Sequence, residues 1–300
     1  MPTAEIASRR SLRRLAAVAA ACTTAGIATG TAHGNSPLIE AGTTYVALGS
    51  SYAAGPALEP IADIDCLRSG SDYAHQVADR FHLNLVDATC SGATSADILT
   101  NHQHGVTGRS LAPQIDAVTS DARLVTITIG GNDLGYVGAL TTLSCRNTLG
   151  PNACSGKAVQ ATAADLDRVK SSLTEVVNTV RAKAPDATVM LVDYLPVLDV
   201  HAETCAAVPL TPDQATALRA TYTGLLAATQ HAADATGATV VRAAADESQH
   251  TACGPQPWVT GFELPNPMAG KGAPYHPNSS GMAAVADAIT TILGHETTEQ

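Results

Sequence analysis

The amino-acid sequence predicts an α/β protein in which helices cover both faces of a central parallel sheet. Three observations point to this class. Segments of strand-like composition alternate with segments of helical periodicity along the chain. One strand-like segment, 124–129, is a continuous run rich in β-branched residues, which is typical of a strand buried on both faces. The chain has 300 residues, enough for one sizeable core, and only 3% are aromatic, which suits packing by small side chains.

The strands are expected at the following places. Residues 43–48 are rich in β-forming side chains and end at Gly49, and residues 83–88 form a second such segment. Residues 124–129 and 188–193 have the composition of buried strands, and the short segment 239–241 is the last strand.

Helical spacing of apolar residues predicts helices at 72–81, 113–118, 158–184, 212–235 and 280–293. Thr211 is the expected N-cap of the fourth helix, and Gly237 its end. The third helix is amphipathic, with one apolar side made of Leu166, Val169, Leu173, Val176, Val177 and Val180.

Two stretches interrupt the alternation. Residues 136–157 and 198–211 are predicted to be long irregular insertions, and each contains cysteine. In α/β sheets, ligands bind beyond the carboxyl ends of the strands, where such loops gather. No linker divides the chain after its N-terminal segment, so residues 35–300 are expected to form a single domain.

The first 34 residues have the features of a secretory signal. Four arginines precede an apolar stretch at 15–27, and small residues follow at 28–34. The segment Ser8-Arg9-Arg10-Ser11-Leu12 also fits a twin-arginine signal, so both export routes stay open. The apolar stretch is too short and too rich in alanine for a stable membrane anchor, and we expect a secreted protein.

The charge of the chain excludes one class of partner. Removing residues 1–34 removes four arginines and Glu5, which leaves 13 basic and 26 acidic residues and a formal net charge of −13. An acidic surface without a basic patch repels nucleic acid.

Six cysteines remain once Cys22 of the signal segment is set aside. An even number in an exported chain indicates disulfides, and six cysteines allow 15 pairings. We favour pairing in sequence order, because it closes three local loops. No C-x-x-C spacing supports the alternative of a zinc site. The favoured pairs are Cys66–Cys90, Cys145–Cys154 and Cys205–Cys253.

Polar residues that can support catalysis follow the predicted strands. Ser51 lies in a turn next to Gly49, directly after the first strand. Gly92 follows the second strand and can present its backbone N–H to a ligand. Asn132 follows two glycines at the end of the third strand. A late histidine, His276, lies in a Pro- and Asn-rich loop that can hold an imidazole still.

These residues and their order resemble the SGNH hydrolase family, also called GDSL-type lipases and esterases, and most closely its secreted actinobacterial members with three disulfides. The resemblance implies a three-layer α/β/α, flavodoxin-like fold and a site without metal or cofactor. It places the nucleophile at Ser51 and the general base at His276. It also places the oxyanion hole at the backbone N–H groups of Ser51 and Gly92 and the side-chain amide of Asn132.

The chain departs from the family pattern at two positions. Ser50 replaces the acidic residue that precedes the nucleophile in the Gly-Asp-Ser motif. Ala273 stands where the triad aspartate lies, three residues before the histidine. Actinobacterial relatives without this aspartate use a main-chain carbonyl to orient the histidine. We therefore expect a Ser–His dyad in which the carbonyl of Ala273 or Pro274 orients His276.

Other polar or aromatic residues have weaker claims to a functional role. His102 and His104 are spaced like a metal pair but lack neighbouring ligands. Asp133 and Asp193 are expected to be structural. Trp258, the only tryptophan, either lines the acyl site or anchors a loop.

The sequence therefore predicts a secreted, monomeric, cofactor-free carboxylic-ester hydrolase that acts on esters of lipids or small alcohols, with phospholipids as a variant. A carbohydrate O-acetyl esterase is the alternative enzyme. A catalytically inert binding protein on the same scaffold is the alternative outside enzymes.

Overall fold

The computed structural model describes residues 39–158, 160–243, 247–263 and 272–296, and the predicted signal at 1–34 lies outside them. A five-stranded parallel sheet has the order β4-β1-β7-β8-β9. Numbered by their order along the chain, these strands give the flavodoxin-like arrangement 2-1-3-4-5. The predicted fold class is confirmed. The strands are β1 (Thr44–Gly49), β4 (Asn84–Asp87), β7 (Ala122–Thr128), β8 (Thr188–Val192) and β9 (Thr239–Val241).

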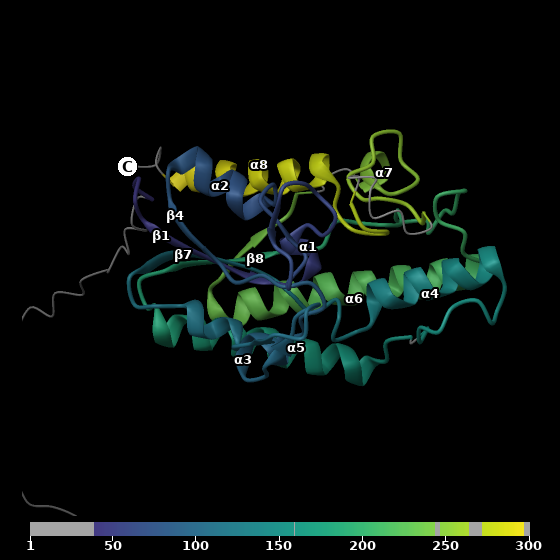
Figure 1. Cartoon of the computed structure of the whole chain (residues 1–300), viewed down its shortest axis with the longest axis horizontal. Coiled ribbons are helices and arrows are strands. Elements are labelled where there is room, and N and C mark those ends of the chain that lie inside the picture. The colour runs from purple at the N-terminus through teal and green to yellow at the C-terminus, as the bar shows by residue number, and fades with distance from the viewer. Residues whose placement is uncertain (1–38, 159, 244–246, 264–271, 297–300) are drawn as a thin grey trace, which may run out of the picture. The chain divides into compact units, whose positions relative to one another are not determined.

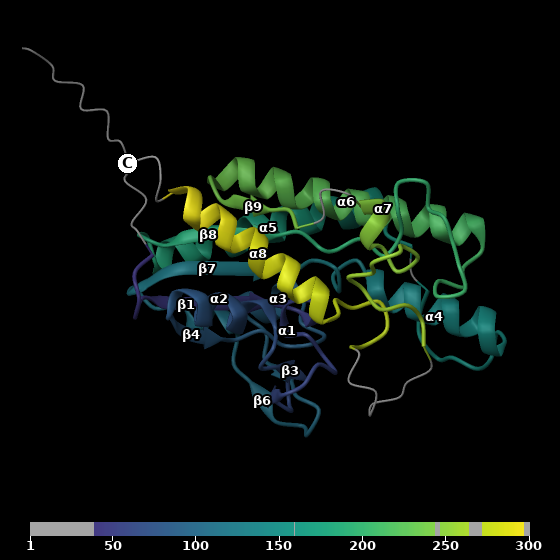
Figure 2. The same cartoon turned by 90° about the horizontal axis from the view of Figure 1, so that it is seen from above.

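Helices cover both faces of this sheet (Figure 1 and Figure 2). One face carries α2 (Tyr73–Phe81) and α8 (Ser279–Glu296). The other carries α3 (Ser95–Leu99), α5 (Ala163–Lys183) and α6 (Pro212–Thr236). No helix among the described residues combines the length and the apolar character that crossing a bilayer requires.

Short elements fill the connections. They are the helices α1 (Ser51–Ala54) and α7 (Glu247–His250) and the 3₁₀ helix η1 (Gln114–Ala117). Two small hairpins pair β2 (Ile61–Asp63) with β3 (Arg68–Ser69) and β5 (Gln103–His104) with β6 (Ser110–Leu111).

The long helices follow from local sequence signals. In α5 the predicted apolar side is buried at Val169, Leu173, Val176, Val177 and Val180. This helix begins at Ala163 rather than at residue 158, because Thr162 and Asp165 form a capping box there. The predicted N-cap Thr211 and the end at Gly237 are both confirmed for α6.

The prediction that residues 136–157 are irregular was wrong, because α4 (Tyr136–Leu149) occupies most of this stretch. Its buried side includes hydroxyl side chains, among them Thr142 and Ser144, so apolar residues alone do not reveal its period. Residues 198–211 contain no helix or strand, as predicted.

The structure contains the three disulfides that pairing in sequence order predicts: Cys66–Cys90, Cys145–Cys154 and Cys205–Cys253. The first connects the β2–β3 hairpin region to the loop that follows β4. The second connects α4 to the loop behind it. The third connects the irregular stretch 198–211 to the segment after α7.

Candidate active site

Ser51 lies at the carboxyl end of β1, where it is the first residue of α1. The turn between the two elements requires glycine at position 49, because an added Cβ would lie 2.6 Å from the Thr128 carbonyl oxygen of β7. The Ser51 hydroxyl oxygen lies 2.8 Å from Nε2 of His276. The structure thus brings together the two residues that the sequence predicts as nucleophile and base, which are 225 positions apart.

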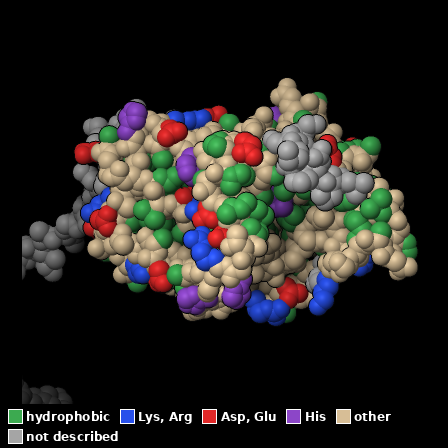
Figure 3. Space-filling model, viewed as in Figure 1, with side chains coloured by type: hydrophobic (Ala, Val, Ile, Leu, Met, Phe, Trp, Pro, Cys, Tyr) green, Lys and Arg blue, Asp and Glu red, His purple; other side chains and the backbone are tan. Residues whose placement is uncertain are grey.

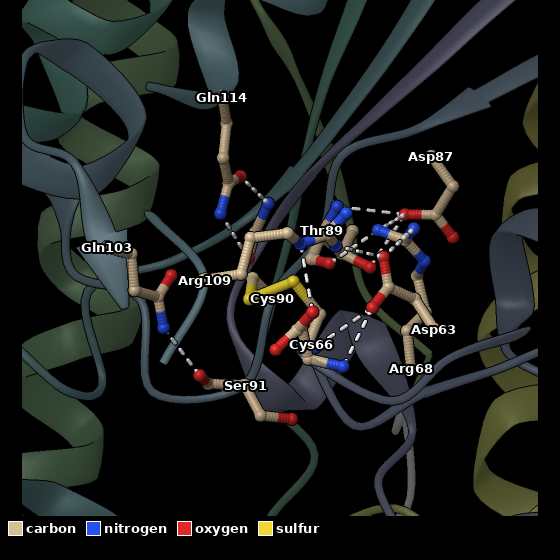
Figure 4. Close-up of a disulfide and its surroundings, with 12 residues drawn as sticks. Asp63, Cys66, Arg68, Asp87, Thr89, Cys90, Ser91, Gln103, Arg109 and Gln114 are labelled. Atoms are coloured by element: carbon tan, nitrogen blue, oxygen red, sulfur yellow. Dashed lines mark hydrogen bonds and ion pairs between the residues drawn. A yellow bond between two sulfur atoms is a disulfide. The ribbon is translucent and has the colours of Figure 1, made fainter. Parts of the chain in front are cut away.

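The backbone before Ser51 is fixed by a residue that sequence reasoning missed. Gln114, in η1, is buried and bonds Gly49 twice (Figure 4). Its Oε1 accepts from the Gly49 N–H at 2.8 Å, and its Nε2 donates to the Gly49 carbonyl at 3.0 Å. The Ser50 N–H donates to the Thr128 carbonyl at 2.9 Å. These bonds attach the turn before Ser51 to its neighbours on the sheet.

Ser50, which stands in place of the family's acidic residue, takes part in a different contact. Its hydroxyl lies 2.8 Å from the Tyr194 hydroxyl, which also accepts the Gly131 N–H at 3.2 Å. The Tyr194 ring stacks on that of Tyr52 with centroids 4.2 Å apart. Tyr194 therefore connects the segments that follow β1, β7 and β8.

His276 is held by both ring nitrogens. Its Nδ1 lies 2.8 Å from the Pro274 carbonyl oxygen, while Nε2 faces Ser51. Burial lowers the pKa of His276 to about 4, although the Pro274 hydrogen bond acts in the opposite direction. The imidazole is therefore neutral near pH 7. Because only Nδ1–H can donate to the carbonyl, Nε2 is left as an acceptor for the Ser51 hydroxyl proton.

The Pro274 carbonyl, rather than that of Ala273, contacts the imidazole. The Ala273 carbonyl instead accepts from the Thr260 hydroxyl and, at 3.1 Å, from the His276 N–H. Of the two carbonyls that the sequence left open, the geometry thus supports Pro274 as the orienting group.

The loop around His276 is pinned by neighbours on both sides. The Tyr52 hydroxyl donates to the Tyr275 carbonyl at 2.7 Å. Thr260 forms two backbone hydrogen bonds with this loop. Its N–H donates to the His276 carbonyl at 2.9 Å, and its carbonyl accepts the Tyr275 N–H at 3.1 Å. Tyr275 has a φ of +61°, a left-handed conformation that is strained for a bulky side chain. The contacts that Tyr52 and Thr260 provide hold the chain in this conformation.

Gly92 lies in the loop after β4 with its backbone exposed and a φ of +86°, which favours glycine. Its N–H has no acceptor within the described part of the chain. The loop is fixed by Cys90, which is bonded to Cys66 and whose N–H donates to the Gly49 carbonyl at 3.0 Å. Gln103 also donates to the Ser91 carbonyl at 2.7 Å (Figure 4).

The Asn132 side chain donates one amide proton to the Ala93 carbonyl at 2.9 Å, which leaves its second amide proton for a ligand. Its neighbour Asp133 has the supporting role that the sequence suggested. The Asp133 carboxylate accepts from the backbone N–H and the hydroxyl of Ser95, at the start of α3.

The other residues singled out in the sequence do not join this group. His102 and His104 are exposed, and they belong to no cluster of metal-ligating side chains among the described residues. Trp258 stacks on His250 with ring centroids 3.6 Å apart, which favours its reading as a loop anchor. Burial raises the pKa of Asp193 to about 7, although Arg242 lowers it.

Comparison with known proteins identifies relatives over most of the chain. The sequence matches the GDSL-like Lipase/Acylhydrolase family over residues 47–284. It is 34% identical over 303 residues to Lipase 2 of Streptomyces coelicolor, covering 95% of this chain and 98% of that one. The structure is similar to phospholipase A1 from Streptomyces albidoflavus, with 26% identity, a TM-score of 0.63 and coverage of 84% and 99%. It is also similar to an extracellular lipase from Streptomyces rimosus, with 26% identity, a TM-score of 0.62 and coverage of 83% and 99%.

Proposed function

Because the chain belongs to the GDSL-like lipase/acylhydrolase family and is an ester-hydrolysing enzyme, we propose that Ser51 is its nucleophile and His276 its general base. The observation that carries this proposal is the pair of 2.8 Å contacts made by His276, one to Ser51 and one to the Pro274 carbonyl. Together they present an acceptor nitrogen to the serine hydroxyl, which is the arrangement that nucleophilic catalysis by serine requires.

The reaction proceeds in two halves. Nε2 of His276 takes the hydroxyl proton as the Ser51 oxygen attacks the ester carbonyl, and the carbonyl electrons move onto its oxygen. The tetrahedral intermediate collapses when His276 gives its proton to the leaving alcohol, which produces an acyl-enzyme on Ser51. Water, deprotonated by the same imidazole, then attacks the acyl-enzyme. The second tetrahedral intermediate collapses by breaking the bond to the Ser51 oxygen, which takes the proton back from His276 as the carboxylic acid leaves.

Three donors are proposed to stabilise the oxyanion. They are the backbone N–H groups of Ser51 and Gly92 and the second amide proton of Asn132. The Gly92 N–H, which has no acceptor among the described residues, and the orientation of the Asn132 amide by Ala93 support this assignment. Fixed donors of this kind stabilise the charge without reorganising during the reaction.

The base is a dyad rather than a triad. Among the described residues no carboxylate bonds the imidazole of His276, whose ring nitrogens face the Pro274 carbonyl and the Ser51 hydroxyl. A neutral carbonyl selects the tautomer, as a triad aspartate does, but stabilises the imidazolium less. The contacts of Tyr52 and Thr260 with this loop supply the positioning that a carboxylate would otherwise reinforce.

The substrate class proposed is a carboxylic ester of a lipid, since two of the relatives are named lipases and one a phospholipase. Secretion is supported by the signal-like segment at 1–34, by the three disulfides and by the extracellular lipase among the relatives. The described residues between 39 and 296 belong to one compact unit, which supports a single hydrolase domain. The expected monomer remains part of this proposal.

Hydrolysis of p-nitrophenyl esters from acetyl to long acyl chains, by the mature protein and by Ser51→Ala, tests this proposal. We expect activity that disappears in the variant, with a chain-length profile that favours longer acyl groups. Activity on acetyl esters alone, together with release of acetate from acetylated sugars, would favour the carbohydrate esterase. Equal rates in both proteins, or none in either, would favour the inert binding protein.

A further inference from the structure

A second cluster of chemically active side chains lies between helix α2 and the end of strand β4. Asp72 is the N-cap of α2, His75 lies in its first turn, and Asp87 is the last residue of β4. One potential ligand atom from each residue lies within 4.8 Å of the other two. We propose that these three side chains bind one divalent transition-metal ion of the zinc type.

Each carboxylate in this cluster has one oxygen with protein donors and one without. Oδ1 of Asp72 accepts the His75 N–H at 2.9 Å, while its Oδ2 is buried with no partner. Oδ1 of Asp87 accepts the N–H and hydroxyl of Thr89 at 2.8 and 2.7 Å, while its Oδ2 is also buried with no hydrogen bond. Asp72 is fully buried, and the Asp87 side chain is 6% exposed. Buried carboxylate oxygens without a partner are costly, and a cation would satisfy both.

His75 completes the ligand set. Its Nδ1 lies 2.9 Å from Asp72 Oδ1 and 3.6 Å from Asp87 Oδ2. Zinc bonds of about 2.0–2.2 Å in a tetrahedron place ligand atoms about 3.3–3.6 Å apart, which matches the 3.6 Å between His75 Nδ1 and Asp87 Oδ2. To bind the ion, Nδ1 must give up its 2.9 Å contact with Asp72 Oδ1. The His75 side chain is 30% exposed, which leaves room for entry and for a water molecule as fourth ligand. One imidazole with two carboxylates suits zinc better than calcium or magnesium, which prefer oxygen ligands.

The surrounding charges also favour a dication. Arg68 lies near Asp63 at 3.4 Å and Asp87 at 3.6 Å (Figure 4), and Arg109 lies near Asp63 and Asp65. In the state that binds a metal, with all carboxyls ionised and His75 neutral, this network has four negative and two positive side chains, a net charge of −2. Burial raises the pKa of Asp87 to about 7, and the hydrogen bond to Asp72 raises the pKa of His75, so the ion displaces protons when it binds. A divalent ion makes it neutral. The network consists of Asp63, Asp65, Asp72, Asp87, Arg68 and Arg109.

The bound ion would connect α2 to the edge strand of the sheet. Within the described part of the chain, no contact joins the three ligands to Ser51 or His276. The ion is therefore assigned to stability and not to ester hydrolysis.

The test uses the mature protein, dialysed against EDTA and then into chelator-free buffer, with Zn²⁺ as the probe. We expect elemental analysis after Zn²⁺ addition and gel filtration to find one zinc per chain. At about 100 times the dissociation constant, we expect the melting temperature to rise by about 5–10 °C. Zinc far below one per chain, with an unchanged melting temperature, would overturn the proposal and leave a proton as the partner of the two carboxylates.

Two variants assign the site. His75→Gln keeps a polar side chain beside Asp72 but removes the nitrogen ligand, and we expect zinc affinity to fall at least tenfold. His104→Gln removes an exposed imidazole from the pair at 102 and 104, and we expect it to bind zinc like the parent. Zinc binding that survives His75→Gln, or that disappears in His104→Gln, would contradict the assignment. If His75→Gln does not fold, Asp87→Asn provides the same test.

Discussion

The serine and the histidine of the proposed dyad are held in different ways. Ser51 follows β1 directly, and the turn before it is fixed by the Ser50–Thr128 backbone bond to β7 and by the two bonds between the Gln114 side chain and Gly49. His276 lies in a loop before α8 and is held by the Pro274 carbonyl, by the Tyr52 hydroxyl and by several hydrogen bonds from Thr260. The nucleophile thus follows a central strand of the sheet, with Gln114 as a further support, whereas the base lies in a loop that only its neighbours hold. For the same loss of stability, substitutions around the histidine should therefore reduce the rate of ester hydrolysis more than substitutions around the serine.

The largest effect is expected from removing the base itself. His276→Gln keeps a polar side chain but cannot accept the Ser51 proton, so we expect kcat to fall about 10⁴-fold. Steady-state hydrolysis of a p-nitrophenyl ester measures this loss. His104→Gln is the matched control and should retain the parent rate. A loss of kcat under tenfold in His276→Gln would contradict the role of His276 as general base.

A smaller loss is expected on the oxyanion side. Asn132→Ala removes one of three proposed donors, so kcat should fall about 10²- to 10³-fold while KM changes little. Asn101→Ala, at an exposed position, serves as the control. If Asn132→Ala raised KM and left kcat intact, Asn132 would belong to substrate binding instead of to the oxyanion hole.

The pH profile tests the burial of the imidazole. Because the pKa of His276 is lowered to about 4, the base stays neutral in mildly acidic solution, and kcat/KM should fall tenfold per pH unit only below about pH 4. The same shift makes folding less favourable once the histidine of the unfolded chain protonates, so stability declines as pH falls from about 6.5 toward 4. An acid limb of kcat/KM near pH 6.5 would contradict the buried, carbonyl-oriented base.

Adding a carboxylate should shift this profile. In Ala273→Asp, a negative charge near the imidazole stabilises the imidazolium, so the acid limb should move up by about one pH unit or more. The uncharged Ala273→Asn controls for side-chain size. If the acid limb of the kcat/KM profile and the rates were unchanged in both variants, the proposed role of the Pro274 carbonyl would be unsupported.

The smallest effect is expected from a matched pair of tyrosines. Tyr52→Phe removes the donor to the Tyr275 carbonyl in the histidine loop. Tyr222→Phe removes a similar bond to the Tyr194 carbonyl, on the serine side. Each should lower stability by about 1–2 kcal/mol, because a buried carbonyl loses its partner. Only Tyr52→Phe should also lower kcat, by about tenfold, measured beside the melting temperature. Equal losses of kcat in Tyr52→Phe and Tyr222→Phe would contradict the proposed difference between the surroundings of His276 and those of Ser51.

The sequence could predict the residues whose position depends on a strand, but not those whose position depends on contacts between distant side chains. Ser51, Gly92 and Asn132 follow predicted strands, and parallel topology places the carboxyl ends of those strands at one edge of the sheet. The contacts of Tyr52, Tyr194 and Gln114 join residues tens to hundreds of positions apart, so no local pattern encodes them.

Other failures also have local physical causes. Helix α4 was missed because its buried side includes Thr142 and Ser144. The choice between Ala273 and Pro274 stayed open because two neighbouring carbonyls differ only in direction, which depends on the left-handed conformation of Tyr275. On the face in Figure 3, Lys and Arg side chains lie among Asp and Glu side chains.

The most direct test of the dyad is covalent labelling by an organophosphonate ester, followed by peptide mass spectrometry of the mature protein and of His276→Gln. Attack on phosphorus requires an activated serine oxygen, so the reaction reports on the nucleophile and its base together. We expect one label per chain, on Ser51, and labelling at least about 10³-fold slower in the variant. Absence of label, a label on another residue, or equal rates in both proteins would contradict the proposed Ser51–His276 dyad.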